Sequence, residues 1–247
     1  MHLLILAAGV GSRLSPETDE TPKCLLDIST NYKILDHQFS IAKDVGLKDI
    51  VIVAGYQIEK IEKHVEKYTG AFNSIRVVYN PFYKTTNNLV SLWLGLSVIQ
   101  NDFVMMNGDT ILHPKILSDC LLQKKSVLIP ISRKLSYDSD DTKLVLNKDE
   151  SIDKIGKKID LEMVDAEWMG VAIFKNNSYK KLKEKTDELI RIPKLLEEYP
   201  HYLSVINGLI TDGVKFETKE FSQHLWTEID YQFDLDDARA HVKRYIN

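Results

Sequence analysis

A glycine-containing loop near the start of the chain carries the residue types that bind phosphate. It turns at Gly9 and Gly11 after an apolar run, and Arg13 and Lys23 follow it. Successive backbone N–H groups in such a turn form a nest for anions, most naturally phosphates. Arginine binds phosphate oxygens with its fork, and lysine adds a compact point charge. We interpret the loop and its two cations as a nucleotide site.

Other readings of this loop remain open on composition alone. The sequence is not G-x-x-x-x-G-K-[ST], which disfavours a P-loop, and it lacks the third glycine of the dinucleotide-binding fingerprint. Arg13 also stands where that fingerprint has small residues. An ordinary turn between a strand and a helix, with incidental charges, is an equal alternative.

Two aspartates follow predicted strands and could hold a divalent cation. Asp109 ends the string Asn107-Gly108-Asp109 after a predicted strand, and Asp230 ends the string WTEID. Magnesium is usually held by one or two carboxylates together with substrate phosphates. Each aspartate also has a plain structural reading: Asp109 as an Asx-turn residue, and Asp230 as part of an acidic pair at a helix start.

The first loop resembles the signature of the nucleotidyltransferases, which couple a nucleoside triphosphate to a phosphorylated sugar, alcohol or amine. The resemblance lies in the string L-A-A-G-x-G-x-R-L over 6–14 and in the P-K at 22–23. It implies Lys23 and Arg13 as catalytic residues. Mg²⁺ is implied as cofactor on Asp109 by the G-D string at 108–109, which resembles the metal site of this family, and on Asp230 by the string over 226–235 described next. The resemblance further implies that the nucleotide contacts Leu6, Ala7, Ala8, Gly9, Gly11, Ser12, Arg13, Lys23, Asn88 and Gly108.

Two further strings resemble the cytidylyltransferase branch of these enzymes. They are N-P-x-Y-x-x-x-N-N-x-x-S-L over 80–92 and W-x-E-I-D-x-x-x-D-L over 226–235. The first implies a nucleotide contact near Asn88, although Asn87 or Asn88 could equally cap a helix. A molybdenum-cofactor-type guanylyltransferase fits less well, because that group has L-A-G-G where this chain has L-A-A-G.

Tryptophan and acidic residues outside these strings could bind an amino group on the acceptor. Cations bind well over tryptophan faces and beside carboxylates. The candidate acceptor residues are Trp93, Glu167, Trp168, Trp226 and Glu228, with Arg133 and Arg191 for an acceptor that bears a carboxylate. For Glu167 and Trp168, an edge glutamate and a core tryptophan are equally good readings.

We therefore expect transfer of CMP from CTP to a small phosphorylated or phosphonate amino compound, with release of pyrophosphate. Phosphocholine, 2-aminoethylphosphonate and phosphoglutamine are acceptors of this type, and the resemblance implies a use in cell-surface polysaccharide or lipid decoration. One alternative is a sugar-1-phosphate nucleotidyltransferase that makes a nucleoside-diphosphate sugar. Another is a non-catalytic nucleotide-binding regulator, which should have lost Lys23 or a metal aspartate; neither is missing.

The elements that must position these residues follow a β-α-β-α-β pattern over 3–79, which predicts a parallel sheet with its ligands at the carboxyl ends of the strands. The resemblance implies an α/β, Rossmann-like nucleotidyltransferase fold: a mixed, mostly parallel sheet, helices on both faces and a small β lobe. We expect one domain over 1–247, with 134–165 as a hairpin lobe or lid. Further strands are predicted at 167–174 and 214–218, and helices at 88–96, 176–199 and 231–245.

Bulk composition agrees with one ordinary globular domain. The chain has 247 residues, a formal net charge of −4 and two cysteines, which favours neither a nucleic-acid partner nor a disulfide framework. No apolar run is long enough for a membrane span or a signal segment. We expect a cytoplasmic enzyme, with a homodimer allowed.

Overall fold

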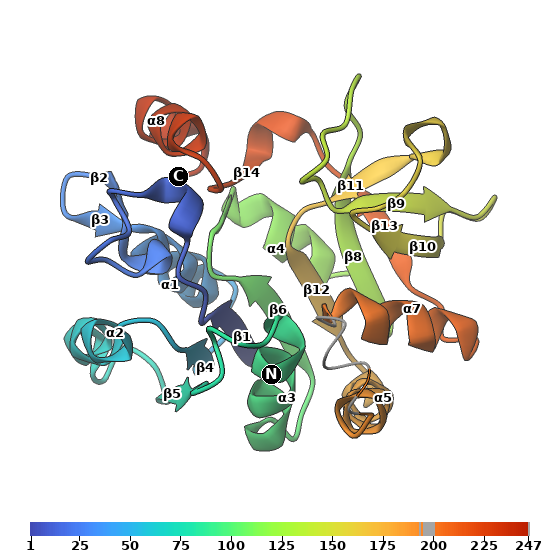
Figure 1. Cartoon of the computed structure of the whole chain (residues 1–247), viewed down its shortest axis with the longest axis horizontal. Helices are drawn as coiled ribbons and strands as arrows, with labels where there is room; N and C mark the ends of the chain where they lie inside the picture. The colour runs from blue at the N-terminus through green and yellow to red at the C-terminus, as the bar shows by residue number, and fades with distance from the viewer. Residues whose placement is uncertain (193, 195–200, 247) are drawn as a thin grey trace.

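The computed structural model describes residues 1–192, 194 and 201–246. The end of the segment 176–199, for which we expected one or two helices, therefore lies outside the described residues. A ten-stranded sheet runs through the molecule in the order β10-β9-β11-β8-β12-β6-β1-β4-β5, with β13 also paired to β8 (Figure 1). The strands are β1 (His2–Ala7), β2 (Asp27–Ser29), β3 (Tyr32–Lys33), β4 (Asp49–Ala54), β5 (Ser74–Tyr79), β6 (Phe103–Asn107), β7 (Thr110–Leu112), β8 (Val127–Ser132), β9 (Lys143–Leu146), β10 (Ile152–Gly156), β11 (Ala166–Trp168), β12 (Val171–Phe174), β13 (Glu217–Glu220) and β14 (Trp226–Glu228).

Helices cover both faces of this sheet, as expected. They are α1 (Ile34–Asp44), α2 (Ile58–Val65), α3 (Asn88–Val98), α4 (Pro114–Leu121), α5 (Ser178–Ile190), α7 (Leu203–Thr211) and α8 (Gln232–Ala240). Alternate residues of β1 face opposite sides, because successive side chains of a strand do so. Leu4 packs in the core that includes residues of α3, α5 and α7, whereas Leu3 and Ile5 pack in the core that includes residues of α1, α2 and α4.

The two halves of the sheet differ in strand direction. Strands β6, β1, β4 and β5 are mutually parallel, which confirms the repeated β-α-β pattern. Beyond β6, strand β12 runs antiparallel to both β6 and β8, and β11, β9 and β10 continue antiparallel. The sheet is therefore mixed, as expected, but its parallel part is confined largely to one half.

The chain breaks the strand that we expected over 167–174. Gly170 has φ +71, a left-handed conformation that glycine adopts without strain. A Cβ there would also lie 2.3 Å from Thr110 Oγ1. The turn produces two strands, β11 and β12, where the apolar pattern predicted one.

The charged segment 134–165 contains a hairpin, as expected, but this hairpin extends the main sheet. Strands β9 and β10 pair antiparallel, and β9 pairs with β11 of the central sheet. The expected small β lobe is therefore continuous with the sheet, and its role as a lid stays a prediction. The last strand of the sheet, β13, lies at Glu217–Glu220, later than the expected 214–218. Phe216, just before it, is fully buried in the core.

A third, small core lies under α8 and fixes the chain around the glycine loop. Leu14, just after the loop, packs in it with Ile229 and Leu235. This packing joins the first and last segments of the chain on one side of the sheet. Within the described residues, no helix is both long enough and apolar enough to cross a membrane.

Candidate active site

The glycine loop and Asp109 meet at the carboxyl ends of β1 and β6. The N–H of Gly108 donates to the carbonyl of Leu6 at 2.9 Å. A Cβ on Gly108 would lie 2.7 Å from Ala7 Cβ and 2.9 Å from Ala7 Cα. Only glycine allows this approach, and it places Asp109 beside the loop.

Asp230 reaches the same place through a separate two-stranded sheet. Strands β7 and β14 pair antiparallel, with Glu228 opposite Thr110. The N–H of Ile229 then donates to the carbonyl of Asp109 at 3.1 Å. Because β7 follows Asp109 and β14 precedes Asp230, this pairing brings the two carboxylates together.

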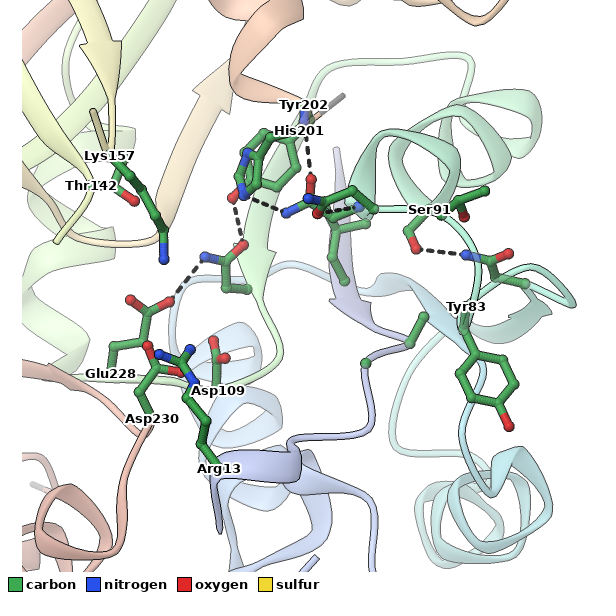
Figure 2. A pocket seen from close by; sticks show the side chains of 18 residues that line it. Arg13, Tyr83, Ser91, Asp109, Thr142, Lys157, His201, Tyr202, Glu228 and Asp230 are labelled. Carbon is green, nitrogen blue, oxygen red and sulfur yellow. Dashed lines mark hydrogen bonds and ion pairs between the residues drawn. The ribbon is translucent and has the colours of Figure 1, made fainter. Parts of the chain in front are cut away.

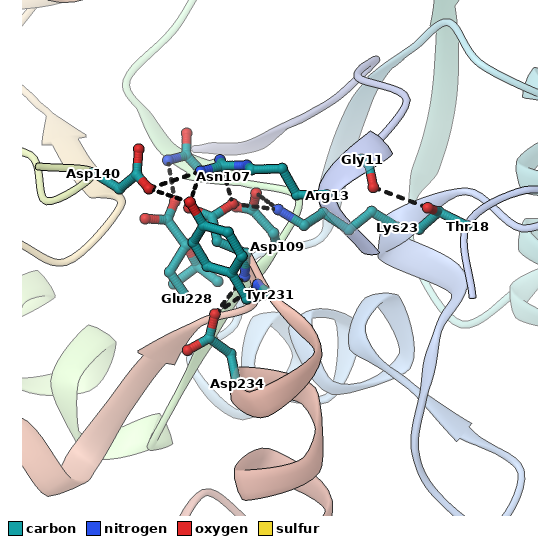
Figure 3. A network of polar contacts seen from close by, with 12 residues as sticks. Gly11, Arg13, Thr18, Lys23, Asn107, Asp109, Asp140, Glu228, Tyr231 and Asp234 are labelled. Carbon is teal, nitrogen blue, oxygen red and sulfur yellow. Dashed lines mark hydrogen bonds and ion pairs between the residues drawn. The ribbon is translucent and has the colours of Figure 1, made fainter. Parts of the chain in front are cut away.

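Lys23 lies between the two carboxylates (Figure 3). Its Nζ donates to Asp109 Oδ2 and to Asp230 Oδ1, each at 2.7 Å. Burial acts to lower the pKa of Lys23, but the two carboxylates overcome it and raise that pKa above its usual value. Burial likewise acts to raise the pKa of Asp230, but Lys23 and Arg13 hold it below its usual range. Lys23 is therefore ion-paired with both carboxylates at once.

The two carboxylates fit a magnesium ion by their chemistry and by one free atom. Asp109 Oδ1 is buried and has no hydrogen-bond partner among the residues that the structure describes, and hard oxygen donors are the ligands that Mg²⁺ takes. Among the described residues, no three His, Cys, Asp or Glu side chains are arranged to hold a metal. A magnesium ion here would therefore need substrate phosphate oxygens as further ligands.

Arg13 faces the same cluster from the glycine loop. Its guanidinium lies 3.1 Å from Asp140 and 3.0 Å from Asp230, and it donates to the Tyr231 hydroxyl at 3.2 Å. The Tyr231 hydroxyl in turn donates to Asp140. The expected phosphate ligand is thus held by acidic partners from two distant segments (Figure 3).

The loop itself leaves open space above its first glycine. A Cβ on Gly9 would meet no atom of the described residues within 4 Å, whereas Gly11 has φ +72 and packs against Thr18 and Lys23. The loop pocket, as we call the cavity at this point, brings together most of the expected nucleotide contacts. It is lined by Leu6, Ala7, Gly9, Gly11, Ser12, Arg13, Lys23, Cys24, Gly108, Asp109 and Asp230.

A second cavity, the asparagine-lined pocket (Figure 2), adjoins the first, because both are lined by Leu6, Gly9, Arg13, Asp109 and Asp230. It contains Ala8 and Asn88 of the expected set, and its wall also includes Asn80, Tyr83, Ser91, Asn107, Thr142, Lys157, His201, Tyr202, Glu228 and Asp230. The Asn88 side chain already serves the fold: its Oδ1 accepts from the Tyr202 N–H at 3.0 Å, and its Nδ2 lies 2.7 Å from His201 Nε2. Asn87 is the residue that caps α3.

Several residues of this pocket gave no usable signal in the sequence. Lys157 follows β10 and extends its ammonium into the pocket near Glu228 (Figure 2), but in the sequence it is one lysine among many in a charged segment. Burial and the charge of Lys157 lower the pKa of His201 to about 3. Tyr202 is nearly fully buried, and its hydroxyl donates to Asn107 Oδ1 at 2.8 Å.

A third cavity, the acidic pocket, contains three of the expected acceptor residues, Glu167, Trp226 and Glu228. It shares Glu228 and Asp230 with the asparagine-lined pocket. Burial raises the pKa of Glu167 to about 7 although Lys134 Nζ lies 2.8 Å from its Oε2. The Trp226 indole N–H donates to Ser132 Oγ at 3.1 Å.

The other four expected acceptor residues lie elsewhere. The Trp93 indole N–H donates to Asp187 on α5 at 2.9 Å, because α3 packs there against α5. Trp168 is 2% exposed, which confirms the alternative interpretation that it is a core tryptophan. Arg133 pairs with Glu150 and Glu220 on the surface, and Arg191 is exposed at the C-terminal end of α5. None of the four lines the acidic pocket or the asparagine-lined pocket.

The profile of the MobA-like NTP transferase domain matches residues 3–133. The choline-phosphate cytidylyltransferase of Streptococcus pneumoniae is 36% identical over 105 residues, which is 42% of this chain and 43% of that protein. The chain thus aligns with less than half of that relative. The CTP:phosphoglutamine cytidylyltransferase of Campylobacter jejuni is 24% identical over 96% of this chain and 98% of its own length.

Solved structures share the fold across the whole chain. The CTP:phosphocholine cytidylyltransferase of Streptococcus pneumoniae aligns with a TM-score of 0.76 at 24% identity and covers 98% of both chains. The inositol-1-phosphate CTP transferase of T. maritima aligns with a TM-score of 0.79 at 21% identity, over 98% of this chain and 96% of that one. These likenesses confirm the α/β nucleotidyltransferase fold with a mixed central sheet.

Proposed function

Because the chain belongs to the family of MobA-like NTP transferase domains, we propose that it is a magnesium-dependent cytidylyltransferase. It transfers CMP from CTP to a small phosphorylated or phosphonate amino compound, releases pyrophosphate, and serves cell-surface polysaccharide or lipid decoration. The observation that carries the proposal is the cluster in which Lys23 joins Asp109 and Asp230 at 2.7 Å, at the end of the glycine loop.

The choice of CTP and of an amino acceptor is supported by the relatives. The names of the two relatives above specify a cytidylyltransferase, one of choline phosphate and one of phosphoglutamine. A third, the CMP-5'-(3-aminopropyl)phosphonate synthase of Streptomyces rubellomurinus, is 31% identical over 55% of this chain and 21% of its own length. The compounds named for these three relatives, choline phosphate, phosphoglutamine and 3-aminopropylphosphonate, all contain nitrogen.

The proposed reaction needs positioning more than proton transfer. An acceptor phosphate or phosphonate oxygen attacks the α-phosphorus of CTP, and pyrophosphate leaves in line. The attacking oxygen is already an anion, so no general base is required. Catalysis then rests on orientation and on stabilising negative charge. Magnesium, when bound to Asp109 and Asp230, supplies charge neutralisation on the phosphates.

The residues of the chain divide this work by position. The loop pocket receives the triphosphate, and Lys23 there stabilises the α-phosphate. Arg13 leaves Asp140, its partner in the structure, and binds the terminal phosphates of CTP. The asparagine-lined pocket receives the nucleoside beside Tyr83 and Asn80. Lys157 binds the acceptor phosphate, because its ammonium extends into this pocket (Figure 2), whose wall also includes Asp109 and Asp230.

The test is pyrophosphate release with Mg²⁺, each of the four nucleoside triphosphates, and a panel of acceptors. The panel holds phosphocholine, phosphoethanolamine, 2-aminoethylphosphonate, phosphoglutamine, inositol 1-phosphate and several sugar 1-phosphates. We expect release with CTP and an amino acceptor, and none from Asp109→Asn. Release only with a sugar 1-phosphate would replace the proposal with an NDP-sugar synthase. Nucleotide binding without release across the panel would favour a regulator.

A further inference from the structure

We propose that Lys143 is a positioning residue, which holds the backbone of Lys157 so that the Lys157 ammonium meets the acceptor phosphate. This inference rests on one part of the proposed function, the binding of the acceptor phosphate by Lys157. Lys143 begins β9 and is not among the described residues that line the three cavities. Any effect that it has on the substrates must therefore act through other residues.

Lys143 is a charged side chain in the interior of the protein. It is 2% exposed, and its Nζ donates to the backbone carbonyls of Ser139, Asp141 and Lys157. The distance to the Lys157 oxygen is 2.9 Å, whereas those to the Ser139 and Asp141 oxygens are 3.4 Å, beyond the usual range for such bonds. The bond to Lys157 is therefore the strongest of the three.

The stability of the fold alone does not account for a lysine at this position. Burying a charged group costs free energy unless it is paired and hydrogen-bonded. The three partners of the Lys143 ammonium are backbone carbonyls, and none of them is a carboxylate. A methionine of similar length would fill the same space without burying a charge. What the ammonium adds is its hold on the chain at these carbonyls.

The strongest of these bonds acts where the chain leaves the sheet and enters the site. The ladder between β9 and β10 ends at the pair of Lys143 with Gly156. Lys157 follows Gly156 directly, and its ammonium extends into the asparagine-lined pocket (Figure 2). The bond to the Lys157 carbonyl thus holds the backbone of the residue whose side chain enters the pocket.

The two longer bonds reach the loop just before β9. Ser139 and Asp141 flank Asp140, whose carboxylate lies 3.1 Å from the Arg13 guanidinium (Figure 3). In the proposed function Arg13 leaves Asp140 to bind CTP, so a looser loop takes no ligand away from the nucleotide. Loss of the Lys143 ammonium should therefore weaken binding of the acceptor and leave binding of CTP intact. General damage to the site would weaken both.

The experiment replaces Lys143 with methionine and measures both substrates. Lys143→Met keeps the length and the apolar stem of the side chain but removes the ammonium. We expect the KM of the acceptor that the natural protein uses best in the panel above to rise about fivefold or more, since small misplacements of positioning groups have effects of this order or larger. The Kd of CTP, measured by calorimetry, should stay within about twofold of its natural value.

A double-mutant cycle shows whether Lys143 acts through Lys157. Lys157→Met alone should raise the acceptor KM, and adding Lys143→Met to it should change that KM by less than about a further twofold. Fully additive effects would overturn the inference, because Lys143 would then act by another route. An unchanged acceptor KM in Lys157→Met would overturn both the role of Lys157 and the inference.

Lys175 offers a matched control away from the site. Its Nζ also donates to backbone carbonyls, those of Leu121 at 2.6 Å and Gln123 at 2.9 Å, at the C-terminal end of α4. It is not among the described residues that line the three cavities. Lys175→Met should leave the acceptor KM within about twofold. An equal rise of this KM in Lys175→Met and Lys143→Met would overturn the inference.

Lys143→Gln decides the question if Lys143→Met does not fold. Its amide is neutral and shorter than the lysine side chain, and we expect the same rise of the acceptor KM at unchanged CTP affinity. A natural acceptor KM in either folded variant would overturn the inference. Turnover of sugar 1-phosphates alone would overturn the proposed function, and the same variants measured with that acceptor would still decide the role of Lys143. No transfer to any acceptor would overturn both.

Discussion

Replacing Lys23 with methionine should lower the stability of the protein, and magnesium should restore part of that stability. Lys23 Nζ lies 2.7 Å from both carboxylates, and the side chains of Lys23, Asp109 and Asp230 are 14%, 23% and 16% exposed. Removing one partner of a buried ion pair costs about 3–5 kcal/mol. Because these groups keep some contact with water, we expect a loss of about 2–4 kcal/mol, or a fall in Tm of about 5–15 °C for a chain of this size.

Magnesium should stabilise the variant more than the natural protein, because in the natural protein the ammonium already neutralises the two carboxylates. A ligand at a hundredfold excess over its Kd adds about 2.7 kcal/mol. The assay is thermal unfolding with and without MgCl₂ and without nucleotide. The control is Lys125→Met at a surface pair with Glu217, for which we expect a loss of at most about 1 kcal/mol.

The difference in stability between the natural protein and Lys23→Met should become smaller at acid pH. The natural protein holds the pKa of Asp230 below its usual range, against the effect of burial, through Lys23 and Arg13. The stability that this provides is present above the unfolded pKa of aspartate and is lost as the pH falls through the folded pKa. A Tm for Lys23→Met equal to that of the control, or an identical magnesium shift in variant and natural protein, would refute the competition between lysine and metal at this site.

Three further outcomes follow from the same geometry. Gly9→Ala should fold normally, since a Cβ there meets no atom of the described part of the chain within 4 Å, yet it should weaken CTP binding, measured by calorimetry, about fivefold or more. Gly108→Ala should instead lower the Tm, because its Cβ would lie 2.7 Å from Ala7 Cβ. Burial raises the pKa of Glu167 to about 7. Its contribution to the free energy of unfolding is therefore fully present below the pKa of glutamate in the unfolded chain and is lost as the pH rises through about 7. Glu167→Gln should accordingly reduce the change of Tm with pH between about pH 4.5 and 7. Arg133→Ala should leave the acceptor KM unchanged, since Arg133 is bound to surface glutamates. A higher acceptor KM would show instead that Arg133 contacts the acceptor.

The sequence predicted the half of the site that is local in the chain. The glycine loop, with Arg13 and Lys23 after it, is a contiguous pattern that follows an apolar strand, and the structure gathers these residues in one pocket. Gly108, expected as a nucleotide contact, also lines this pocket. For such features the reason for the residue type lies within a few positions of it, so a single sequence suffices.

The other half depends on contacts between distant segments. Asp230 reaches Asp109 through the pairing of β7 with β14. Nothing in the residues themselves predicts this pairing, and only the resemblance to the cytidylyltransferases implied that Asp230 lies at the site. Trp93 and Trp168 could not be told from pocket tryptophans, because an aromatic residue in an apolar run fits a core and a ligand site equally well. Lys157 was missed because its neighbours in the sequence are also charged. It lies directly after β10, and only the folded structure shows that it lines the asparagine-lined pocket.

The pairing of β14 with β7 also bears on how an incomplete chain would behave. Trp226 pairs with Leu112 and Glu228 with Thr110, so β14 covers an edge of β7 that is otherwise bare. A fragment cut before β14 would keep the whole glycine loop but display that short apolar strand, whose residues are fully buried in the intact fold. Exposed strand edges recruit other strands. Proteolytic removal of the last segment should therefore yield self-association together with inactivity.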